Sequence, residues 1–335
     1  MKPVIFGIAG AALSADERAF FRDADPLGYI LFKRNCVDRT QMKALTDDLR
    51  ALSGRDDLPI LIDQEGGRVS RMVPPEWPAF PAGLAFDRLY DLAPISAIEA
   101  VLANGEALGR MLAEVGVNVN CAPLLDVRQP DVTPAIGDRA FGGEPMRVAA
   151  LGQAMLDGMQ RAGVVGIVKH MPGHGRALVD SHYELPRVRA DAAALEMDLE
   201  PFQRLRDAPM AMTCHVVFDA WDAERPATIS PSVIADIIRG RIGFDGLLMT
   251  DDIDMKALSG TAGEKGAAAL EAGCDVVLDC WARMPEMVEI AGRIGNAAAQ
   301  CVTRLDRAMA TVADAAPSGD VDALVAKRDE LLALV

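Results

Sequence analysis

Eight short runs of apolar, strand-favouring residues recur along the chain, and most are followed by a longer segment of helical composition. Strands that alternate with helices are typical of a parallel sheet, and strands buried on both faces read as continuous apolar runs. The predicted strands are Val4–Ile8, Tyr29–Phe32, Ile60–Ile62, Val117–Ala122, Val165–Val168, Pro209–Thr213, Gly246–Met249 and Val276–Leu278. The predicted helices are Arg39–Leu52, Ile95–Val115, Pro145–Ala162, Ala192–Asp207, Pro231–Ile238, Gly263–Ala272 and a final helix within Asp320–Val335.

Eight such units in 335 residues fit a (β/α)8 barrel, which typically needs about 250 residues. We therefore predict the α/β class, with residues 1–335 forming a single catalytic (β/α)8 TIM barrel domain. The alternative is a doubly wound open sheet, which predicts a Gly-rich phosphate turn after the first strand. The stretch Gly7-Ile8-Ala9-Gly10 does not match that fingerprint.

Composition narrows the classes of function. The net charge of −15 disfavours nucleic acid as a partner, because such binding depends on Lys and Arg contacting phosphates. No apolar run approaches the roughly 20 residues that span a bilayer, so no membrane segment is expected. The apolar start of the chain reads as a first buried strand, with a short signal peptide as the alternative. Six cysteines without a Cys-x-x-Cys pair indicate reduced thiols in a cytoplasmic protein.

Polar residues follow the predicted strands where the strands end. In a (β/α)8 barrel the carboxyl ends of the strands carry the active site, so these residues are expected to converge there. The strand-end groups are Lys33-Arg34-Asn35, Asp63-Gln64-Glu65-Gly66-Gly67-Arg68, Asp126, Lys169-His170, His215, Asp251-Asp252 and Asp279.

Three of the four histidines lie between residues 170 and 182, in a stretch with little helical or strand pattern up to about Arg187. Long irregular loops in compact domains are often functional. Within this one, Asp180 and His182 are two residues apart, so an extended or turn backbone places both side chains on one side. Asp180 can then hold one ring nitrogen and leave the other to exchange a proton. The competing interpretation is a surface turn with an incidental contact.

The spacing of His170 and His174 also suggests a metal site, since His-x-x-x-His on a helix binds zinc. Pro172-Gly173 lies between them and disfavours a regular helix. We therefore favour His170 and Lys169 as hydrogen-bond donors to a ligand, with His174 as a structural residue, and we expect no metal or other cofactor.

Two further strand ends carry carboxylates. Adjacent strand residues point to opposite sides, so only one of Asp251 and Asp252 can face the barrel mouth. A carboxylate there can act as nucleophile, base or metal ligand, and the alternative role is helix capping. We expect both, with one aspartate catalytic and the other supporting the turn. After another strand, Gly66-Gly67 permits a tight turn beside Asp63, whose carboxylate suits the vicinal hydroxyls of a sugar. An ion pair of Asp63 or Glu65 with an arginine is the alternative there.

Taken together, these motifs resemble the bacterial β-N-acetylglucosaminidases of glycoside hydrolase family 3, which act in peptidoglycan recycling. The matching stretches occur in family order over most of the chain. They are Leu31-Phe32-Lys33-Arg34-Asn35, Ile62-Asp63-Gln64-Glu65-Gly66-Gly67-Arg68-Val69, Ile136-Gly137-Asp138-Arg139-Ala140-Phe141-Gly142, Lys169-His170-Met171-Pro172-Gly173-His174-Gly175, Asp180-Ser181-His182 and Thr250-Asp251-Asp252.

The resemblance implies a retaining exo-β-N-acetylglucosaminidase that works through a covalent glycosyl-enzyme on small carbohydrates or muropeptides. It implies Asp251 as the nucleophile and His182, assisted by Asp180, as the acid/base, in place of the usual second carboxylate. It also implies that the terminal N-acetylglucosamine is bound by a set of five residues. These are Asp63, Arg71, Arg139, Lys169 and His170.

The chain departs from the family at two places. Met171 stands where Phe is common, and Arg176-Ala177 stands where Asp-Thr is common. Met is an adaptable apolar replacement, whereas Arg176 reverses a charge beside the predicted catalytic loop. A single barrel also matches the short bacterial members rather than the two-domain β-glucosidases.

Other functions fit parts of this pattern. A β-glucosidase or a phosphorolytic N-acetylglucosaminidase would keep the fold and change the sugar or the acceptor. A metal-dependent hydrolase would use His170, His174 and Asp251. A sugar-binding barrel without turnover is the remaining alternative.

Overall fold

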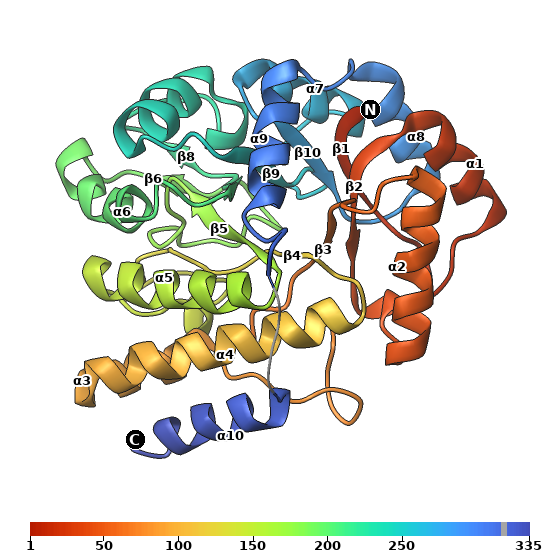
Figure 1. Cartoon of the computed structure of the whole chain (residues 1–335). Helices are drawn as coiled ribbons and strands as arrows, with labels where there is room; N and C mark the ends of the chain where they lie inside the picture. The colour runs from red at the N-terminus through yellow and green to blue at the C-terminus, as the bar shows by residue number, and fades with distance from the viewer. Residues whose placement is uncertain (316–319) are drawn as a thin grey trace.

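The fold is described from a computed structural model that covers residues 1–315 and 320–335. Within these residues, eight parallel strands form a closed barrel (Figure 1) in the order β1-β10-β9-β7-β5-β4-β3-β2. They are β1 (Lys2–Gly7), β2 (Pro26–Leu31), β3 (Ile60–Ile62), β4 (Val119–Asn120), β5 (Val165–Met171), β7 (Met210–Thr213), β9 (Leu247–Asp252) and β10 (Val276–Asp279). The predicted (β/α)8 barrel is confirmed.

Helices fill the connections between successive barrel strands. They are α1 (Ala15–Ala24), η1 (Lys33–Asn35), α2 (Arg39–Ser53), α3 (Gly83–Leu92), α4 (Pro94–Glu114), η2 (Gly137–Arg139), α5 (Pro145–Arg161), α6 (Ala192–Arg204), η3 (Ala227–Ile229), the π-type helix η4 (Val233–Ile242) and α7 (Ala262–Ala272). After the last strand come α8 (Met284–Arg293), α9 (Ala299–Ala310) and α10 (Val321–Leu332). The predicted final helix is thus present, and it lies along α4 (Figure 1), where the Arg328 guanidinium donates to Asn104 Oδ1 at 3.2 Å.

Strand alternation divides the buried residues into two layers. One core cluster contains alternate residues of most barrel strands, such as Ile5, Leu61 and Ile167, and fills the barrel interior. Their neighbours along the strands, such as Phe6 and Ile60, belong to a second cluster that packs against the helices. This division follows from the two-residue period of a strand and sets which strand-end residues face the barrel axis.

Three strands extend further toward their carboxyl ends than the sequence predicts. β5 includes Lys169 and His170, β9 includes Asp251 and Asp252, and β10 includes Asp279, all of which we had expected in the following loops. Lys169 and His170 stay in the strand because carboxylates on neighbouring segments satisfy their polar groups, as described below. The stretch after Met171 has no regular structure until a small parallel pair outside the barrel, β6 (Arg187–Val188) with β8 (Val217–Phe218).

Helices α1, α3, α8 and α9 were not predicted. The first of them carries a capping box, since Ser14 Oγ accepts from the Glu17 N–H while the Glu17 carboxylate accepts from the Ser14 N–H. That pattern was readable in the sequence.

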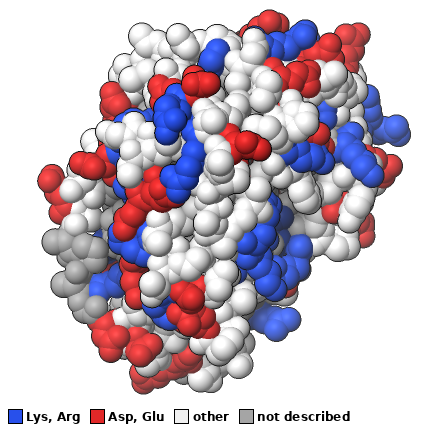
Figure 2. All heavy atoms as spheres, turned by 90° about the vertical axis from the view of Figure 1, so that its right-hand side faces the viewer, with Lys and Arg blue, Asp and Glu red and all other residues white. Residues whose placement is uncertain are grey.

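The surface is mixed in charge despite the excess of acidic residues. On the face that carries α1, α2 and α8, Lys and Arg side chains lie among Asp and Glu (Figure 2). Among the described residues, no helix combines the length and apolarity needed to cross a bilayer.

Candidate active site

In three barrel strands, alternate residues face the barrel axis, and the last residue of each inward-facing series, at the carboxyl end of the strand, is polar. Leu61 of β3 lies in the interior cluster, and Asp63 is two residues further on. In the same way Lys169 follows Ile167 on β5, and Asp251 follows Met249 on β9. Residues two apart on a strand share a face, so these three side chains point toward the barrel axis above the apolar interior.

A cavity of about 280 Å³ opens above them. All eight residues predicted for catalysis and substrate binding line it, namely Asp63, Arg71, Arg139, Lys169, His170, Asp180, His182 and Asp251. Additional lining residues include Glu65, Arg68, His174, Ser181 and Met255. The segments that contribute these residues are far apart in sequence, and the closed barrel brings their ends together.

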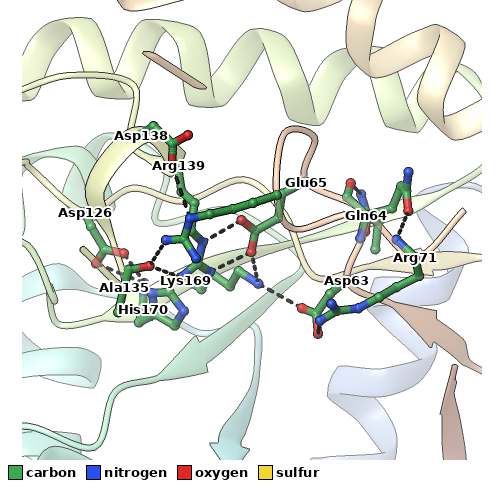
Figure 3. A network of polar contacts seen from close by, with 12 residues as sticks. Asp63, Gln64, Glu65, Arg71, Asp126, Ala135, Asp138, Arg139, Lys169 and His170 are labelled. Carbon is green, nitrogen blue, oxygen red and sulfur yellow. Dashed lines mark hydrogen bonds and ion pairs between the residues drawn. The ribbon is translucent and has the colours of Figure 1, made fainter. Parts of the chain in front are cut away.

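The first wall of the cavity is a buried network of alternating charges (Figure 3). Lys169 Nζ lies 3.0 Å from Asp63 Oδ1 and 2.7 Å from Glu65 Oε1, although only 2% of the Lys169 side chain is exposed. Arg139 forms two 2.7 Å hydrogen bonds with the Glu65 carboxylate. Buried charges are retained when paired in this way.

These pairs determine the protonation states. Burial opposes ionisation of Asp63, but Lys169 and Arg71 outweigh it and hold the pKa of the Asp63 carboxyl below its usual value. Burial likewise opposes the charge of Lys169, yet Asp63 and Glu65 raise the pKa of the ammonium. Two of the three Lys169 donors are engaged, so one N–H is available to a ligand in the cavity.

The turn after β3 positions Arg71. Gly66 and Gly67 have φ of 111° and 56°, in the left-handed region that favours glycine. Gln64 then closes the loop, since its Oε1 accepts from the backbone N–H of Arg71 at 2.8 Å. The Arg71 guanidinium reaches Asp63 Oδ2 at 3.3 Å.

A histidine–carboxylate pair adjoins this network, and its histidine, His170, lines the cavity. His170 Nδ1 lies 2.7 Å from Asp126 Oδ2, and His170 and Asp126 are 5% and 0% exposed. The other oxygen, Asp126 Oδ1, accepts from the backbone N–H of His174 at 2.7 Å. Burial would raise the pKa of the Asp126 carboxyl, but His170 outweighs it and lowers that pKa. With Nδ1 held by the carboxylate, Nε2 of His170 is the ring atom left for a ligand.

His174, for which the sequence predicts a structural role, also lines the cavity. Its ring is buried, and its Nδ1 has no hydrogen-bond partner within the described residues. Burial, reinforced by the neighbouring His170, lowers the pKa of His174 to about 4, so the ring is neutral at pH 7.

A second histidine–carboxylate pair stands on the irregular loop after β5. His182 Nδ1 lies 2.7 Å from Asp180 Oδ1, and that same oxygen accepts from the His182 backbone N–H at 2.9 Å. The His182 side chain is 56% exposed and Asp180 is 28% exposed. Partial burial opposes ionisation of Asp180, but the hydrogen bonds from His182 outweigh it and lower the pKa of the Asp180 carboxyl. The spacing thus produces the predicted contact and leaves Nε2 free.

The start of this loop is fastened by Arg176. Its Nε lies 2.5 Å from Asp198 Oδ2 on α6, and its terminal nitrogen donates to the Ala194 carbonyl at 2.9 Å. The charge reversal seen in the sequence therefore has a structural partner, a buried carboxylate on the helix that packs beside the loop.

The two aspartates of β9 are separated as strand geometry requires. Asp251 faces the cavity, and among the described residues its carboxylate forms no ion pair. Asp252 points away: its carboxylate accepts from the Cys280 N–H at 3.3 Å, the Asp254 N–H at 3.2 Å and Trp281 Nε1 at 3.0 Å. Burial raises the pKa of Asp252 to about 6. Asp252 therefore supports the strand end, and Asp251 is the carboxylate presented to a ligand.

Sequence reasoning did not assign Glu65 or Asp126 to this site, although the ion pair of Glu65 with an arginine that it offered as an alternative is present with Arg139. Both were noted at strand ends, but nothing in the sequence says that Glu65 pairs with Lys169 or Asp126 with His170. As for metals, the described residues contain no group of three His, Cys, Asp or Glu side chains placed to hold one ion.

The chain is similar to known proteins over most of its length. Residues 8–317 match the model of the glycosyl hydrolase family 3 N-terminal domain. A beta-hexosaminidase from Alkalilimnicola ehrlichii is 40% identical over 283 residues, which cover 83% of this chain and 80% of that protein. A beta-hexosaminidase from Bordetella avium is 37% identical over 284 residues, with shares of 83% and 80%.

Solved structures of similar fold point to the same family. NagZ from Neisseria gonorrhoeae, determined in complex with N-trifluoroacetyl-D-glucosamine, superposes with a TM-score of 0.88 at 30% identity and covers 99% of this chain and 98% of its own. A family 3 beta-N-acetylglucosaminidase from Paenibacillus gives a TM-score of 0.86 at 31% identity, covering 98% of this chain and 66% of its own. The chain is therefore a glycoside hydrolase that belongs to glycosyl hydrolase family 3.

Proposed function

We propose that the protein is a retaining exo-β-N-acetylglucosaminidase and that residues 1–335 act as one catalytic domain. The observation that carries this proposal is the convergence of Asp251 and the Asp180–His182 pair on one cavity that is also lined by a set of paired hydrogen-bonding groups. The names of the relatives support the choice of sugar, since both of these enzymes are beta-hexosaminidases and NagZ was solved with N-trifluoroacetyl-D-glucosamine.

The first step needs a nucleophile and an acid. Asp251 attacks the anomeric carbon and forms a glycosyl ester as the bond to the leaving oxygen breaks. His182, protonated at Nε2, gives that proton to the departing oxygen, while Asp180 holds the Nδ1–H and stabilises the imidazolium.

The second step reverses the proton transfer. Neutral His182 takes a proton from water, and the hydroxide equivalent attacks the anomeric carbon and releases Asp251. Two displacements at one carbon retain the β configuration. The 56% exposure of His182 suits both steps, because its free nitrogen must meet a leaving group first and a water afterwards.

The buried wall supplies recognition. The carboxylate of Asp63 accepts from sugar hydroxyls, and Lys169, Arg71, Arg139 and His170 donate to hydroxyl or carbonyl oxygens. Since each of the donor side chains is already paired with Asp63, Glu65 or Asp126, little ordering is needed when the sugar binds.

We further propose peptidoglycan fragments, specifically 1,6-anhydro-muropeptides, as substrates, and the cytoplasm as the location. The substrate rests on the motif resemblance. The location is supported by six cysteines that are all free thiols in the fold.

The decisive experiment is covalent trapping. A 5-fluoro glycosyl fluoride that keeps the 2-acetamido group slows both displacements, so the glycosyl-enzyme accumulates and can be mapped by peptide mass spectrometry. We expect the label on Asp251. We also expect Asp251→Asn to lower kcat by about 10⁴-fold or more with an unchanged unfolding midpoint. A label elsewhere, or inactivation without any label, contradicts the covalent role of Asp251.

The acceptor and the sugar need separate tests. A histidine acid/base repels phosphate less than a carboxylate would, so phosphorolysis is the alternative that this site favours. Free N-acetylglucosamine as the product in phosphate buffer supports hydrolysis, and the sugar 1-phosphate supports phosphorolysis. Faster turnover of the glucoside than of the N-acetylglucosaminide would make the protein a β-glucosidase, and loss of activity on chelation would restore the metal-dependent alternative.

A further inference from the structure

The exposed aromatic rings of this protein are confined to the mouth of the barrel. The sequence contains 16 Phe, Trp and Tyr residues, all within the described part of the chain, and only two are exposed. Tyr183 is 73% exposed and Trp281 is 55% exposed. Both follow barrel strands at their carboxyl ends, after β5 and β10. A solvent-exposed aromatic ring offers a large, flat apolar surface to a ligand.

Each ring is close to a proposed catalytic group: Tyr183 is its neighbour in the sequence, and Trp281 is hydrogen-bonded to such a neighbour. Tyr183 directly follows His182 in the tight turn where its backbone N–H donates to the Asp180 carbonyl at 3.0 Å. Trp281 Nε1 donates at 3.0 Å to the carboxylate of Asp252, the neighbour of Asp251. The mechanism described above uses neither ring.

The loops that carry the two rings are linked through the loop after β9. The Ala257 N–H donates to the Ser181 carbonyl at 3.3 Å, which joins this loop to the one that carries Tyr183. On its other side, Asp254 forms a 2.5 Å ion pair with Arg283. The Arg283 guanidinium lies 5.9 Å from the centre of the Trp281 ring.

Trp281 is therefore held although it is exposed. Its edge is fixed by Asp252, and Arg283 packs over the ring while pairing with Asp254 and Glu286. A solvent-exposed ring without such contacts would rotate freely and lose entropy on binding. A ring that is already ordered loses little entropy on binding, so it can stack on a flat apolar face of a ligand at low cost.

The size of the cavity shows where such a ligand belongs. At about 280 Å³ it is close to the lower end of ligand pockets, about 300–1,000 Å³. It has room for little more than the sugar that is cleaved off. The leaving group must therefore lie outside it, at the rim beside His182, which protonates the departing oxygen.

We propose that Trp281 and Tyr183 form a subsite for the leaving group and that this subsite takes a pyranose ring, whose C–H face packs on the aromatic faces. The inference rests on the proposed function, since it assigns the side of the site that the leaving group occupies. It makes the enzyme selective for glycosidic bonds to another sugar over bonds to small or ringless leaving groups.

The test compares two substrates that share the cleaved sugar. One is the β-1,4-linked disaccharide of N-acetylglucosamine, and the other is N-acetylglucosaminyl β-fluoride, whose leaving group has no ring. The measured quantity is the ratio of kcat/KM for the disaccharide to kcat/KM for the fluoride. We expect this ratio to fall about tenfold in Trp281→Ala and Tyr183→Ala, from the stacking lost with one aromatic face.

Trp281→Phe and Tyr183→Phe keep the ring and are expected to keep most of the ratio. Leu185→Ala and Ile95→Ala remove exposed aliphatic side chains, the first from the same loop and the second from α4, and are expected to leave the ratio unchanged. Unfolding midpoints measured for all variants separate a folding defect from a binding defect.

The outcomes are distinct. An unchanged ratio in both alanine variants overturns the subsite and leaves the two rings for another partner, such as a protein surface. A fall of the same size in Trp281→Phe and Trp281→Ala shows that the Asp252 contact, rather than stacking, is what matters, and also overturns it. If the wild-type protein releases N-acetylglucosamine from neither substrate, the proposed function itself fails.

Discussion

Two histidine–carboxylate pairs with the same contact distance, one buried and one exposed, contribute a histidine each to the cavity at the barrel mouth. Nδ1 of His170 lies 2.7 Å from Asp126, and Nδ1 of His182 lies 2.7 Å from Asp180. The first pair is buried and is bonded further to the His174 backbone, whereas the second is exposed on an irregular loop. The same contact therefore serves two purposes, and solvent access decides which.

The buried pair is costly to break, because removing one partner would leave the other buried without its contact. It fixes a ring as a directed hydrogen-bonding group. The exposed pair leaves Nε2 of His182 accessible to a leaving group and to water, which a general acid/base requires. Burial thus separates a binding histidine from a proton-transferring histidine on one continuous stretch of chain.

The largest expected effect of breaking one pair is on stability. Asp126→Ala removes the partner of His170 and leaves buried donors unsatisfied, so we expect a loss of about 3–5 kcal/mol in the free energy of unfolding. Asp180→Ala breaks the exposed pair and is expected to cost less than about 1 kcal/mol. Urea titrations of both variants at pH 7 measure the difference. Equal losses would remove the distinction between the pairs.

The second effect is on activity, which we expect to depend on the exposed pair even though stability depends mainly on the buried pair. Asp180→Ala leaves His182 without its orienting carboxylate, so kcat/KM is expected to fall about 10²-fold on a substrate with a poor leaving group. The fall should be mainly in kcat, because the sugar-binding wall is intact. A change confined to KM would mean that Asp180 serves binding rather than proton transfer.

The smallest effect concerns a buried carboxyl without a partner. Neither oxygen of Asp279 has a hydrogen-bond partner in the described residues, and burial raises the pKa of this group to about 7. The folded state then holds a proton that the unfolded state, with an ordinary carboxyl pKa near 4, releases. Stability contributed by this group is therefore present at low pH and lost as pH rises toward 7.

Between pH 5 and pH 8 we expect the wild-type protein to lose about 2–3 kcal/mol more unfolding free energy than Asp279→Asn. Thermal or urea unfolding at the two pH values measures this, with the exposed Asp314→Asn as the control. Parallel pH profiles for wild type and Asp279→Asn would show that Asp279 is not protonated in the fold.

The sequence was a good guide to the fold and to the residues that line the site. Asp63, Lys169 and Asp251 stand at ends of apolar strands, and strand alternation turns them inward. The Asp180–His182 contact is local, so a spacing of two residues was enough to predict it. Local chemistry and strand geometry account for these successes.

The remainder depends on contacts between distant segments. Glu65 reaches Lys169, and Asp126 reaches His170, only after the barrel has closed, and no local pattern announces such a partner. For the same reason the strands continue through Lys169 and Asp251, where polarity alone suggested a loop. The burial that distinguishes His170 from His182 is likewise a property of the closed barrel.

The most direct test of this distinction is the dependence of kcat/KM on leaving-group pKa. A series of aryl N-acetylglucosaminides would be measured with wild type, His182→Ala and His170→Ala. The account predicts a steep dependence for His182→Ala alone, with losses of about 10²–10⁴-fold on the poorest leaving groups and little loss on the best. His170→Ala should lower the whole series by a constant factor. A steep dependence for His170→Ala, or parallel lines for His182→Ala and wild type, would contradict the assignment of the proton to the exposed pair.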